Sequence, residues 1–248
     1  MNSVLESSDI KIREIVELNE IKHVAVIMDG NRRWAKLHKL PTPMGHKKGV
    51  EALKNTVKAC DDFGIKYLTV YAFSTENWNR KPEEVDFLMD LFGKTIKNEL
   101  QELNEKNVVM SFIGDTTKLG TKLQEILQNA VEKTKNNTGV HLQIAFNYGS
   151  RAEIARAVKS IATDVKDGKL SVEEISEDTI SNALYTSNIP DPDYLVRTGG
   201  EMRISNYLLW QIAYSELIII DKFWPEFDKD VLKETILTFN SRHRRFGV

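Results

Sequence analysis

Six short apolar runs alternate with longer segments of helical periodicity along this chain of 248 residues. The runs are rich in Val, Ile, Leu and Phe with few polar positions between, which is typical of parallel strands covered on both faces. They cover His23–Met28, Tyr67–Tyr71, Val108–Ile113, His141–Phe146, Tyr194–Val196 and Leu217–Ile220. The alternation predicts an α/β fold, a single domain with a mainly parallel central sheet of about six strands flanked by helices.

Helix signals fill the intervals between these runs. Apolar residues recur at steps of three and four from Val50 to Cys60, and Gly64 follows as a helix stop. Pro82 begins a second helix, since proline is favoured in the first helical turn. Further helices are expected over residues 119–130, 152–165 and 231–239. Residues 1–20 are predicted to form an N-terminal helical extension, and residues 21–248 the single main domain.

The composition excludes several classes of protein. With 34 basic and 36 acidic residues the formal net charge is −2, so the chain lacks an overall positive field and nucleic acid is not an expected partner. The single cysteine, Cys60, excludes an intrachain disulfide, and its apolar helical row favours burial. The N-terminus lacks the apolar core of a signal peptide, and residues 207–220 are too polar to span a bilayer. A cytoplasmic protein is predicted.

Polar loops follow most of the predicted strands. They are DGNRRW at residues 29–34, FSTENWNR at 73–80, NYGSR at 147–151 and RTGGEMR at 197–203. Ligands of open α/β sheets bind outside the carboxyl ends of the strands, so we expect these loops to meet there. Their arginines, glycines and amides predict an anion site.

The loop at residues 29–33 combines a carboxylate with groups that suit phosphate. Gly30 lets the backbone approach a ligand closely, and Arg33 offers a planar fork for phosphate oxygens. A bare phosphate would repel Asp29, so the chemistry that suits this carboxylate is a Mg²⁺ ion bridging phosphate oxygens. An equally good interpretation is a simple turn in which Asn31 caps a helix.

The segment 197–205 favours a second phosphate group. Arg197 follows an apolar strand, Arg203 and Ser205 come after a double glycine, and Glu201 is expected to orient Arg197. The alternative is a surface loop with solvated arginines. Glu216, just before the last apolar run, needs a nearby cation unless it lies exposed at a helix end.

Other side chains near these loops have more than one interpretation. Arg80 either clamps a phosphate or pairs with Glu83 or Glu84. His46 donates to a phosphate oxygen, shuttles a proton, or simply lies at the start of a helix. Three aromatic side chains either wall an apolar substrate tail or belong to the core: Trp34, Phe73 and Trp78.

Seven motifs follow one another between His23 and Gly247: HVAVIMDGNRRWAK, GHKKG, YAFSTENWNR, NYGSR, RTGGEMRISNYLLWQIAYSEL, FWPEF and RRFG. Together they resemble the cis-prenyltransferases, in particular the bacterial undecaprenyl diphosphate synthases. The resemblance implies the parallel-sheet fold of that family, Mg²⁺ as the cofactor and a homodimer.

The resemblance also implies roles for individual residues. Asp29 matches the essential acidic residue that engages Mg²⁺ and the allylic diphosphate, and Glu216 matches a residue that helps to hold the ion. Asn77 matches a catalytic position near the reacting ends. The cradle for farnesyl diphosphate is matched by Gly30, Asn31, Arg33 and Arg80, and the isopentenyl diphosphate site by Arg197, Arg203 and Ser205, with Glu216. Further substrate-binding residues are Arg32, Trp34, Lys39, His46, Phe73, Ser74 and Trp78.

Some positions concern the dimer and the product rather than the diphosphates. Arg245-Phe246-Gly247 resembles a C-terminal element that reaches the active site across the dimer interface. Thr42 stands where many members have an arginine for the allylic diphosphate, and either Arg32 or Lys39 is expected to compensate. Phe146 stands at a position that is often smaller. Val140 matches the floor of an apolar tunnel expected between helices 47–63 and 82–103.

The activity implied is a Mg²⁺-dependent condensation of isopentenyl diphosphate onto farnesyl diphosphate. Its product is a long-chain Z-polyprenyl diphosphate, the undecaprenyl precursor of the lipid carrier for cell-wall sugars. Release of so apolar a product implies transient contact with the inner face of the membrane. Two alternatives stay open, a shorter-chain cis-prenyl diphosphate synthase and a non-catalytic partner subunit of the same fold.

Overall fold

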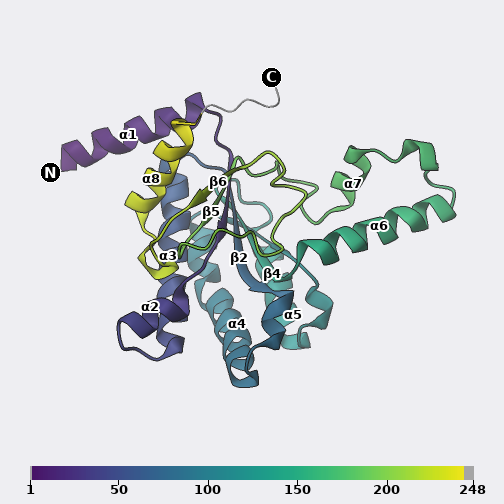
Figure 1. Ribbon diagram of the computed structural model, residues 1–248, viewed down its shortest axis with the longest axis horizontal. Coiled ribbons are helices and arrows are strands. Elements are labelled where there is room, and N and C mark those ends of the chain that lie inside the picture. The colour runs from purple at the N-terminus through teal and green to yellow at the C-terminus, as the bar shows by residue number, and fades with distance from the viewer. Residues whose placement is uncertain (1, 243–248) are drawn as a thin grey trace.

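The computed structural model of the chain describes residues 2–242, and the side chains of residues 8–242. Its centre is a six-stranded sheet in the order β3-β4-β2-β1-β5-β6 (Figure 1). Each pair of neighbouring strands runs parallel. The predicted α/β fold with a parallel sheet of about six strands is confirmed.

The strands agree with the six apolar runs, with shifts at their ends. They are β1 (His23–Ile27), β2 (Tyr67–Ser74), β3 (Val109–Ile113), β4 (His141–Tyr148), β5 (Tyr194–Arg197) and β6 (Glu216–Ile219). β2 and β4 extend past their predicted ends because they pair with each other as far as Ser74 and Tyr148. Phe73 and Ser74 therefore belong to a strand, where the sequence predicted the start of a loop.

The predicted helices are all present, and the structure adds short ones. They are α1 (Asn2–Leu18), α2 (Asn31–Leu37), α3 (Thr42–Phe63), α4 (Pro82–Glu105), α5 (Thr121–Thr134), α6 (Ser150–Lys166), α7 (Glu177–Ala183) and α8 (Lys229–Asn240). Gly64 ends α3 at φ +83°, as its position predicted. α2 and α7 have seven residues each, too few for helical periodicity to reveal them.

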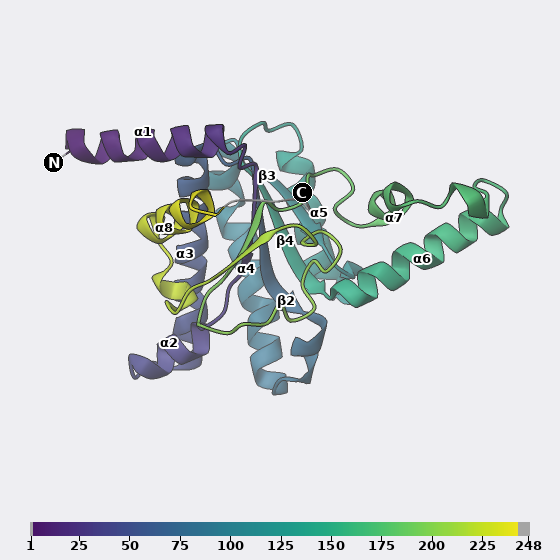
Figure 2. The same ribbon diagram turned by 45° about the horizontal axis from the view of Figure 1, so that its top comes forward.

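The two faces of the sheet are covered differently. Val24 and Val26 of β1 point into the larger core, which also contains residues from α1, α3, α4, α5 and α8. Ala25 and Ile27 point to the other face, where Tyr207 and neighbouring residues of the segment 204–212 cover them. Figures 1 and 2 show α6 and α7 extending away from the sheet, beyond this second face. The edge formed by the carboxyl ends of the strands stays accessible.

α1 contributes Ile12 and Val16 to the larger core, and it packs on α3 and α8. The division into an extension at residues 1–20 and a catalytic domain at 21–248 stays a prediction. Cys60 is buried, and burial raises the pKa of its thiol, in line with the expected packing role. None of the helices in the described part of the chain is long and apolar enough to cross a bilayer.

Candidate active site

The strand order reverses direction between β1 and β5. After β1 the chain builds β2, β3 and β4 on one side, and then crosses to the other side for β5 and β6. Open α/β sheets bind ligands at such a reversal, outside the carboxyl ends of the strands. Ile27 pairs with Arg197 at this edge. Asp29 and Arg197 are therefore neighbours, although 168 positions separate them in the sequence.

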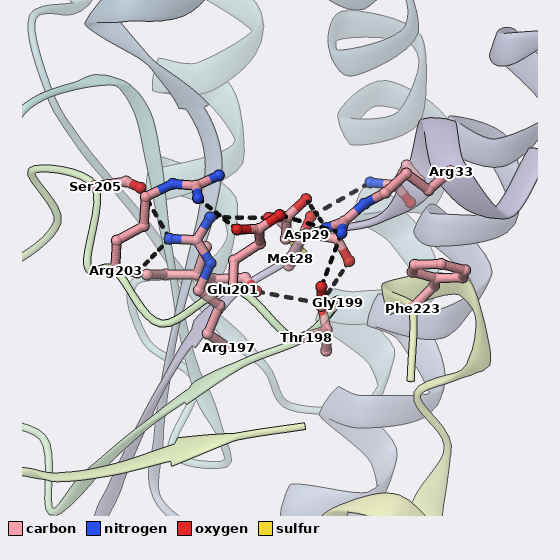
Figure 3. A network of polar contacts seen from close by, with 12 residues as sticks. Met28, Asp29, Arg33, Arg197, Thr198, Gly199, Glu201, Arg203, Ser205 and Phe223 are labelled. Carbon is pink, nitrogen blue, oxygen red and sulfur yellow. Dashed lines mark hydrogen bonds and ion pairs between the residues drawn. The ribbon is translucent and has the colours of Figure 1, made fainter. Parts of the chain in front are cut away.

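Arg197 is a nearly buried cation, only 4% exposed. Its Nη2 donates to Asp29 Oδ2 at 2.8 Å, and its Nη1 donates to Ser205 Oγ at 2.8 Å and to the carbonyl oxygen of Arg203 (Figure 3). Its Nε is buried without a hydrogen-bond partner among the described residues. The guanidinium is thus fixed in place by the protein through three of its five N–H donors, and the Nε donor is among those left unused.

Arg33 reaches the other oxygen of the same carboxylate. Its Nη2 lies 3.0 Å from Asp29 Oδ1, and its Nη1 donates to the carbonyl oxygen of Gly199 at 2.8 Å. The guanidinium also lies over the ring of Phe223, 5.3 Å from its centroid. Gly199 has φ +82°, and a Cβ there would collide with Arg33 Nη2, so this turn requires glycine.

Glu201 pairs with two other arginines. Its Oε1 lies 3.4 Å from Arg33 Nη1, and its Oε2 pairs with Arg203 Nη1. No ion pair or hydrogen bond joins Glu201 to Arg197 in the described part of the chain, so the prediction that Glu201 orients Arg197 is wrong. Asp29 orients it instead, because Asp29 follows the strand beside Arg197 whereas Glu201 lies beyond the double-glycine turn.

The charges around Asp29 keep it ionised. Burial by itself would raise the pKa of this carboxyl, but hydrogen bonds and charges from Arg197 and Arg33 outweigh that effect and lower the pKa below its usual value. An anionic group held between two cations is consequently present at neutral pH.

Two open polar cavities share Met28, Asp29 and Arg80. The first has a volume of about 700 Å³, and its other lining residues are Gly30, Asn31, Arg32, Arg33, Lys36, Leu40, Pro41, Thr42 and His46. The second has a volume of about 550 Å³, and its other lining residues are Tyr71, Phe73, Ser74, Glu76, Asn77, Arg197, Arg203, Ser205 and Asn206. The structure thus divides most of the predicted site residues between two adjoining cavities.

The first cavity contains polar atoms that the protein leaves unpaired. Asn31 Oδ1 and His46 Nε2 are buried and have no hydrogen-bond partner among the described residues. Burial, with the positive charge of Arg80 second, lowers the pKa of His46 to about 4, so its ring is neutral at pH 7. Arg80 Nη1 lies 3.0 Å from Glu84 Oε1, and Arg32 Nη1 lies 3.7 Å from Oε2 of the same residue. Of the two partners predicted for Arg80, Glu84 is the one in place.

The second cavity depends on a residue that the sequence did not single out. Asn206 has φ +62°, its Nδ2 donates to Glu76 Oε1 at 2.9 Å, and its Oδ1 accepts the N–H of Arg151 at 2.9 Å. Asn206 thereby ties the loop after β5 to the loop after β2. The 3₁₀ helix η1 (Thr75–Asn79) is closed by Asn77 Oδ1, which accepts the N–H of Ser74 at 3.2 Å. In the sequence, Asn206 stands beside Ser205 within the motif of residues 197–217.

A third, apolar cavity lies between α3 and α4, above β2 and β4. It measures only about 120 Å³ and shares Met28, Asn31 and His46 with the first polar cavity. Phe92 of α4 stacks on Phe146 of β4 with their ring centroids 3.8 Å apart. This apolar cavity lies between α3 and α4, where the tunnel was predicted. Its other apolar walls are Val50, Leu53, Ala72, Phe73, Leu88, Leu91, Ile96, Ile144 and Trp224.

Val140 does not line this apolar cavity. It lies with Val57 and Leu103 in a separate cavity of about 260 Å³, near the other end of the two helices. Lys54 of α3 stands at the edge of that cavity, and its Nζ lies 2.6 Å from Glu99 and 3.0 Å from Glu102 of α4. An ion-pair cluster thus joins the two helices beyond the apolar cavity.

Known proteins match this chain over most of its length. Residues 27–247 match the prenyltransferase family model described as "Putative undecaprenyl diphosphate synthase". An isoprenyl transferase of Clostridium tetani is 48% identical, over 98% of this chain and 95% of its own length. A ditrans,polycis-undecaprenyl-diphosphate synthase of Micrococcus luteus, specific for (2E,6E)-farnesyl diphosphate, is 47% identical over 96% and 98% of the two chains. The chain belongs to the undecaprenyl diphosphate synthase family and is a prenyltransferase.

A solved structure agrees with this assignment. Lavandulyl diphosphate synthase from Lavandula x intermedia, in complex with dimethylallyl diphosphate, superimposes with a TM-score of 0.89. It is 35% identical in sequence, and the match covers 92% of this chain and 98% of the other. The resemblance that the motifs indicated, to the cis-prenyltransferases, is confirmed.

Some predicted substrate-binding side chains of this prenyltransferase lie away from the three cavities. The Trp34 ring contacts that of His38 in a tilted arrangement with 4.3 Å between ring centroids, and Lys39 is exposed beyond the end of α2. Trp78 Nε1 donates to Asn147 Oδ1 at 2.7 Å, which turns the indole toward a groove between α4 and α5. None of these three side chains lines the three cavities, so their substrate-binding roles stay predictions, whereas Phe73 lines the second polar cavity and the apolar one.

Glu216 lies at the amino ends of the strands, whereas Asp29 lies at their carboxyl ends. Glu216 is the first residue of β6 and pairs in register with Tyr194, whereas the carboxyl ends of the strands meet at Ile27 and Arg197. Its carboxylate lies 2.7 Å from Arg242 Nη1. Within one chain Glu216 therefore lies away from Asp29, and the metal-binding role of the two residues stays a prediction. The side chains of residues 8–242 include no group of three or more His, Cys, Asp or Glu able to hold a metal ion. The predicted element at residues 245–247 lies outside the described residues.

Proposed function

We propose that this prenyltransferase condenses isopentenyl diphosphate units onto farnesyl diphosphate to make a long-chain Z-polyprenyl diphosphate. The observation that supports this best is Asp29, held between Arg33 and Arg197 where the two polar cavities meet. Each cavity is bordered by arginines and is large enough for one diphosphate. The farnesyl-specific relative from Micrococcus luteus supports farnesyl diphosphate as the starter.

The two cavities suit the two substrates. The first takes the allylic diphosphate on Gly30, Asn31, Arg33 and Arg80, and it adjoins the apolar cavity that receives the hydrocarbon tail. The second takes isopentenyl diphosphate on Arg197, Arg203 and Ser205. Holding both substrates fixes the double bond of one against C1 of the other, and such positioning contributes up to about 7–11 kcal/mol to the rate.

The chemistry develops negative charge on the departing diphosphate. Arg33 and Arg80 border the cavity where that charge appears, and Arg33 is already oriented by Asp29 and the carbonyl oxygen of Gly199. Cations fixed in advance stabilise developing charge without reorganisation during the step. His46 is neutral at pH 7 and borders the same cavity; its Nε2 makes no hydrogen bond with the described residues and lies 4.0 Å from Glu84 Oε1.

The donor set around Asp29 fits a Mg²⁺ ion that arrives with a diphosphate. Mg²⁺ retains several waters and is held by one or two carboxylates together with substrate phosphates, rather than by a cage of protein ligands. Asp29 is a single ionised carboxylate bordering both cavities. When bound, the ion supplies charge neutralisation on the diphosphate. Glu216 can contribute only from a second subunit, which the proposed homodimer provides.

The growing chain enters the apolar cavity between α3 and α4. At about 120 Å³ this cavity is much smaller than the polar cavities of about 700 and 550 Å³, so a lengthening chain has to move α3 and α4 apart. Each buried CH₂ contributes about 0.8 kcal/mol, which compensates for opening the walls. Phe146, stacked on Phe92, stands in the path of the tail and sets where it turns or stops.

The activity is tested by incubating the purified chain with farnesyl diphosphate and labelled isopentenyl diphosphate, with Mg²⁺ or with excess chelator. The extracted products are then sized. A Mg²⁺-dependent series ending in one long species supports the proposal. A single short product would instead assign the chain to the shorter-chain synthases. No product under any condition would favour a non-catalytic partner subunit.

Arg32 is proposed to compensate for Thr42 because both line the first cavity, whereas Lys39 does not. The Michaelis constant for farnesyl diphosphate is expected to rise about tenfold in Arg32→Ala, with Lys39→Ala as the control. No change in Arg32→Ala would contradict the idea. The cytoplasmic location, the transient membrane contact and the role in supplying a cell-wall lipid carrier belong to the same proposal.

A further inference from the structure

The mouth of the first polar cavity continues into an exposed tip made of the end of α2, the connecting loop and the start of α3. We define it as residues 36–48 and call it the α2–α3 tip. In Figure 1 α2 and this loop stand at the end of the molecule opposite α1. Residues 36–41 form an unbroken exposed run. Because Lys36, Leu40 and Pro41 also line the cavity, the tip and the site share one opening.

The charge of this part of the chain differs from that of the whole. Residues 30–50 contain six Lys and Arg residues and no Asp or Glu, whereas the complete chain has a net charge of −2. Arg32 and Arg33 point to carboxylates at the site, and Lys48 pairs with Glu51. Lys36, Lys39 and Lys47 are exposed, and in residues 8–242 no carboxylate pairs with them. Their positive charge is directed at solvent.

The same tip exposes large apolar side chains. Leu37 is 67% exposed, Leu40 40% and Met44 44%. Singly exposed apolar residues are ordinary, but these three lie within eight positions and alternate with lysines. Apolar side chains together with Lys and Arg, without acidic residues, are typical of surfaces that lie in a lipid headgroup region.

We propose that the α2–α3 tip docks this enzyme onto an anionic lipid bilayer. Leu37, Leu40 and Met44 insert below the headgroups, and Lys36, Lys39 and Lys47 lie against the lipid phosphates. The inference rests on the proposed function in one respect, since an apolar polyprenyl product needs a bilayer at the opening through which it leaves. The geometry supports this partner because Leu40 lines that opening and the exposed Leu37 and Met44 lie three and four positions from Leu40 along the chain.

Vesicle flotation of the full-length chain, without substrates, tests the proposal. We expect binding to vesicles of phosphatidylglycerol mixed with phosphatidylcholine, and at least about tenfold weaker binding to phosphatidylcholine alone. Raising NaCl to 0.5 M should weaken binding to the anionic vesicles, since salt screens exposed charges. Equal binding to both vesicle types would overturn the electrostatic part of the proposal.

Two variants separate the contributions of the tip. Leu37→Ser/Met44→Ser should weaken vesicle binding about tenfold or more, because two apolar side chains no longer insert. Lys47→Gln should weaken it about fivefold, the effect expected of one cation near an anionic surface. The matched controls are Leu18→Ser and Lys66→Gln, which are exposed at the amino edge of the sheet. They should bind as the wild type does. Tip variants that bind as well as their controls would overturn the proposal.

A parallel assay distinguishes this inference from the proposed function. Leu37, Met44 and Lys47 do not line the three cavities, so condensation of isopentenyl diphosphate in vesicle-free buffer should be unchanged in their variants. If the wild type makes polyprenyl product but does not bind vesicles, the docking proposal is contradicted and the proposed function is not. Vesicle binding that depends on the tip, without any product, would support the surface and contradict the proposed function.

Discussion

The charged edge of the sheet and the apolar cavity beside it are organised in opposite ways. At the charged edge, Asp29, Arg33 and Arg197 already hold one another at 2.8–3.0 Å. In the apolar cavity, Phe92 and Phe146 stack and leave only about 120 Å³. The two regions share Met28, Asn31 and His46, so the difference appears within a few residues.

The contrast follows from the cost of leaving each kind of group unsatisfied. A buried charge without a partner is strongly destabilising, so the arginines keep carboxylate and carbonyl partners whether or not a diphosphate is bound. An empty apolar cavity instead forfeits packing, so its walls close until a chain fills it. Recognition of the diphosphates therefore uses a site that is already formed. The hydrocarbon has to open its own space.

The substitution with the largest expected effect removes the carboxylate at the charged edge. Asp29→Asn should lower the rate of condensation about 10³-fold, since it removes the anion that holds both guanidinium groups and the carboxylate proposed for Mg²⁺. The measurement is the steady-state rate with farnesyl and isopentenyl diphosphates. The control is Glu201→Gln, which removes a carboxylate 3.4 Å from Arg33 Nη1. It should lower the rate of condensation no more than about tenfold. A variant of Asp29 that keeps activity within tenfold of the wild type would contradict this assignment.

A second substitution opens the apolar cavity. Phe146→Ala should lower the free energy of unfolding by about 3–5 kcal/mol and extend the product distribution to longer chains, since the stack against Phe92 is lost. Urea denaturation and product sizing measure the two effects. Phe112→Ala removes an edge-to-face contact with Phe92 outside the cavity and should destabilise without changing product length. Equal product changes in both variants would show that Phe146 has no special place in the tail's path.

The pH dependence of stability tests two buried histidines, one of which, His46, lies where the charged edge and the apolar cavity meet. Burial lowers the pKa of His46 and of His23 to about 4, below the ordinary value of about 6.5. Between pH 6.5 and 4 the unfolded chain therefore binds protons that the folded chain does not, so stability falls as pH falls through this window. From pH 7 to 5 each histidine should contribute a loss of about 2 kcal/mol.

His46→Gln isolates one of these contributions. The variant should lose about 2 kcal/mol less than the wild type between pH 7 and 5, as measured by urea denaturation at both values. The same substitution at His38, an exposed residue of the α2–α3 tip, is the matched control. An unchanged pH dependence in His46→Gln would mean that the ring is not neutral in the folded protein.

The smallest expected effect concerns the ion-pair cluster between α3 and α4. Lys54→Met should lower the free energy of unfolding by about 0.5–1 kcal/mol, because the lysine pairs with two carboxylates across the helices but remains partly exposed. Lys94→Met, which removes an exposed pair within α4, should cost about 0.3–0.5 kcal/mol and serves as the comparison. Thermal unfolding resolves the two. A larger loss in Lys94→Met would show that the cross-helix pairs do not hold α3 and α4 together.

Parts of the site could be predicted because neighbours in sequence are neighbours in space. The loop 29–33 and the segment 197–205 each contain a compact set of phosphate-binding groups, and the structure brings both to the first and second cavities. The pair between Arg32 and Glu84 and the hydrogen bonds of Asn206 could not be predicted. Each joins residues of different segments, and residue type alone does not reveal such contacts.

The sequence by itself determined the α/β fold, because apolar runs of strand length between helical segments allow few other ways to bury their surface. It also determined which loops lie at the carboxyl ends of parallel strands. Only the tertiary structure decided that Asp29, not Glu201, orients Arg197, and that Glu216 lies at the opposite edge. The physical reason is that these relations depend on strand order and register, which are set by packing of the whole sheet and not by spacing along the chain.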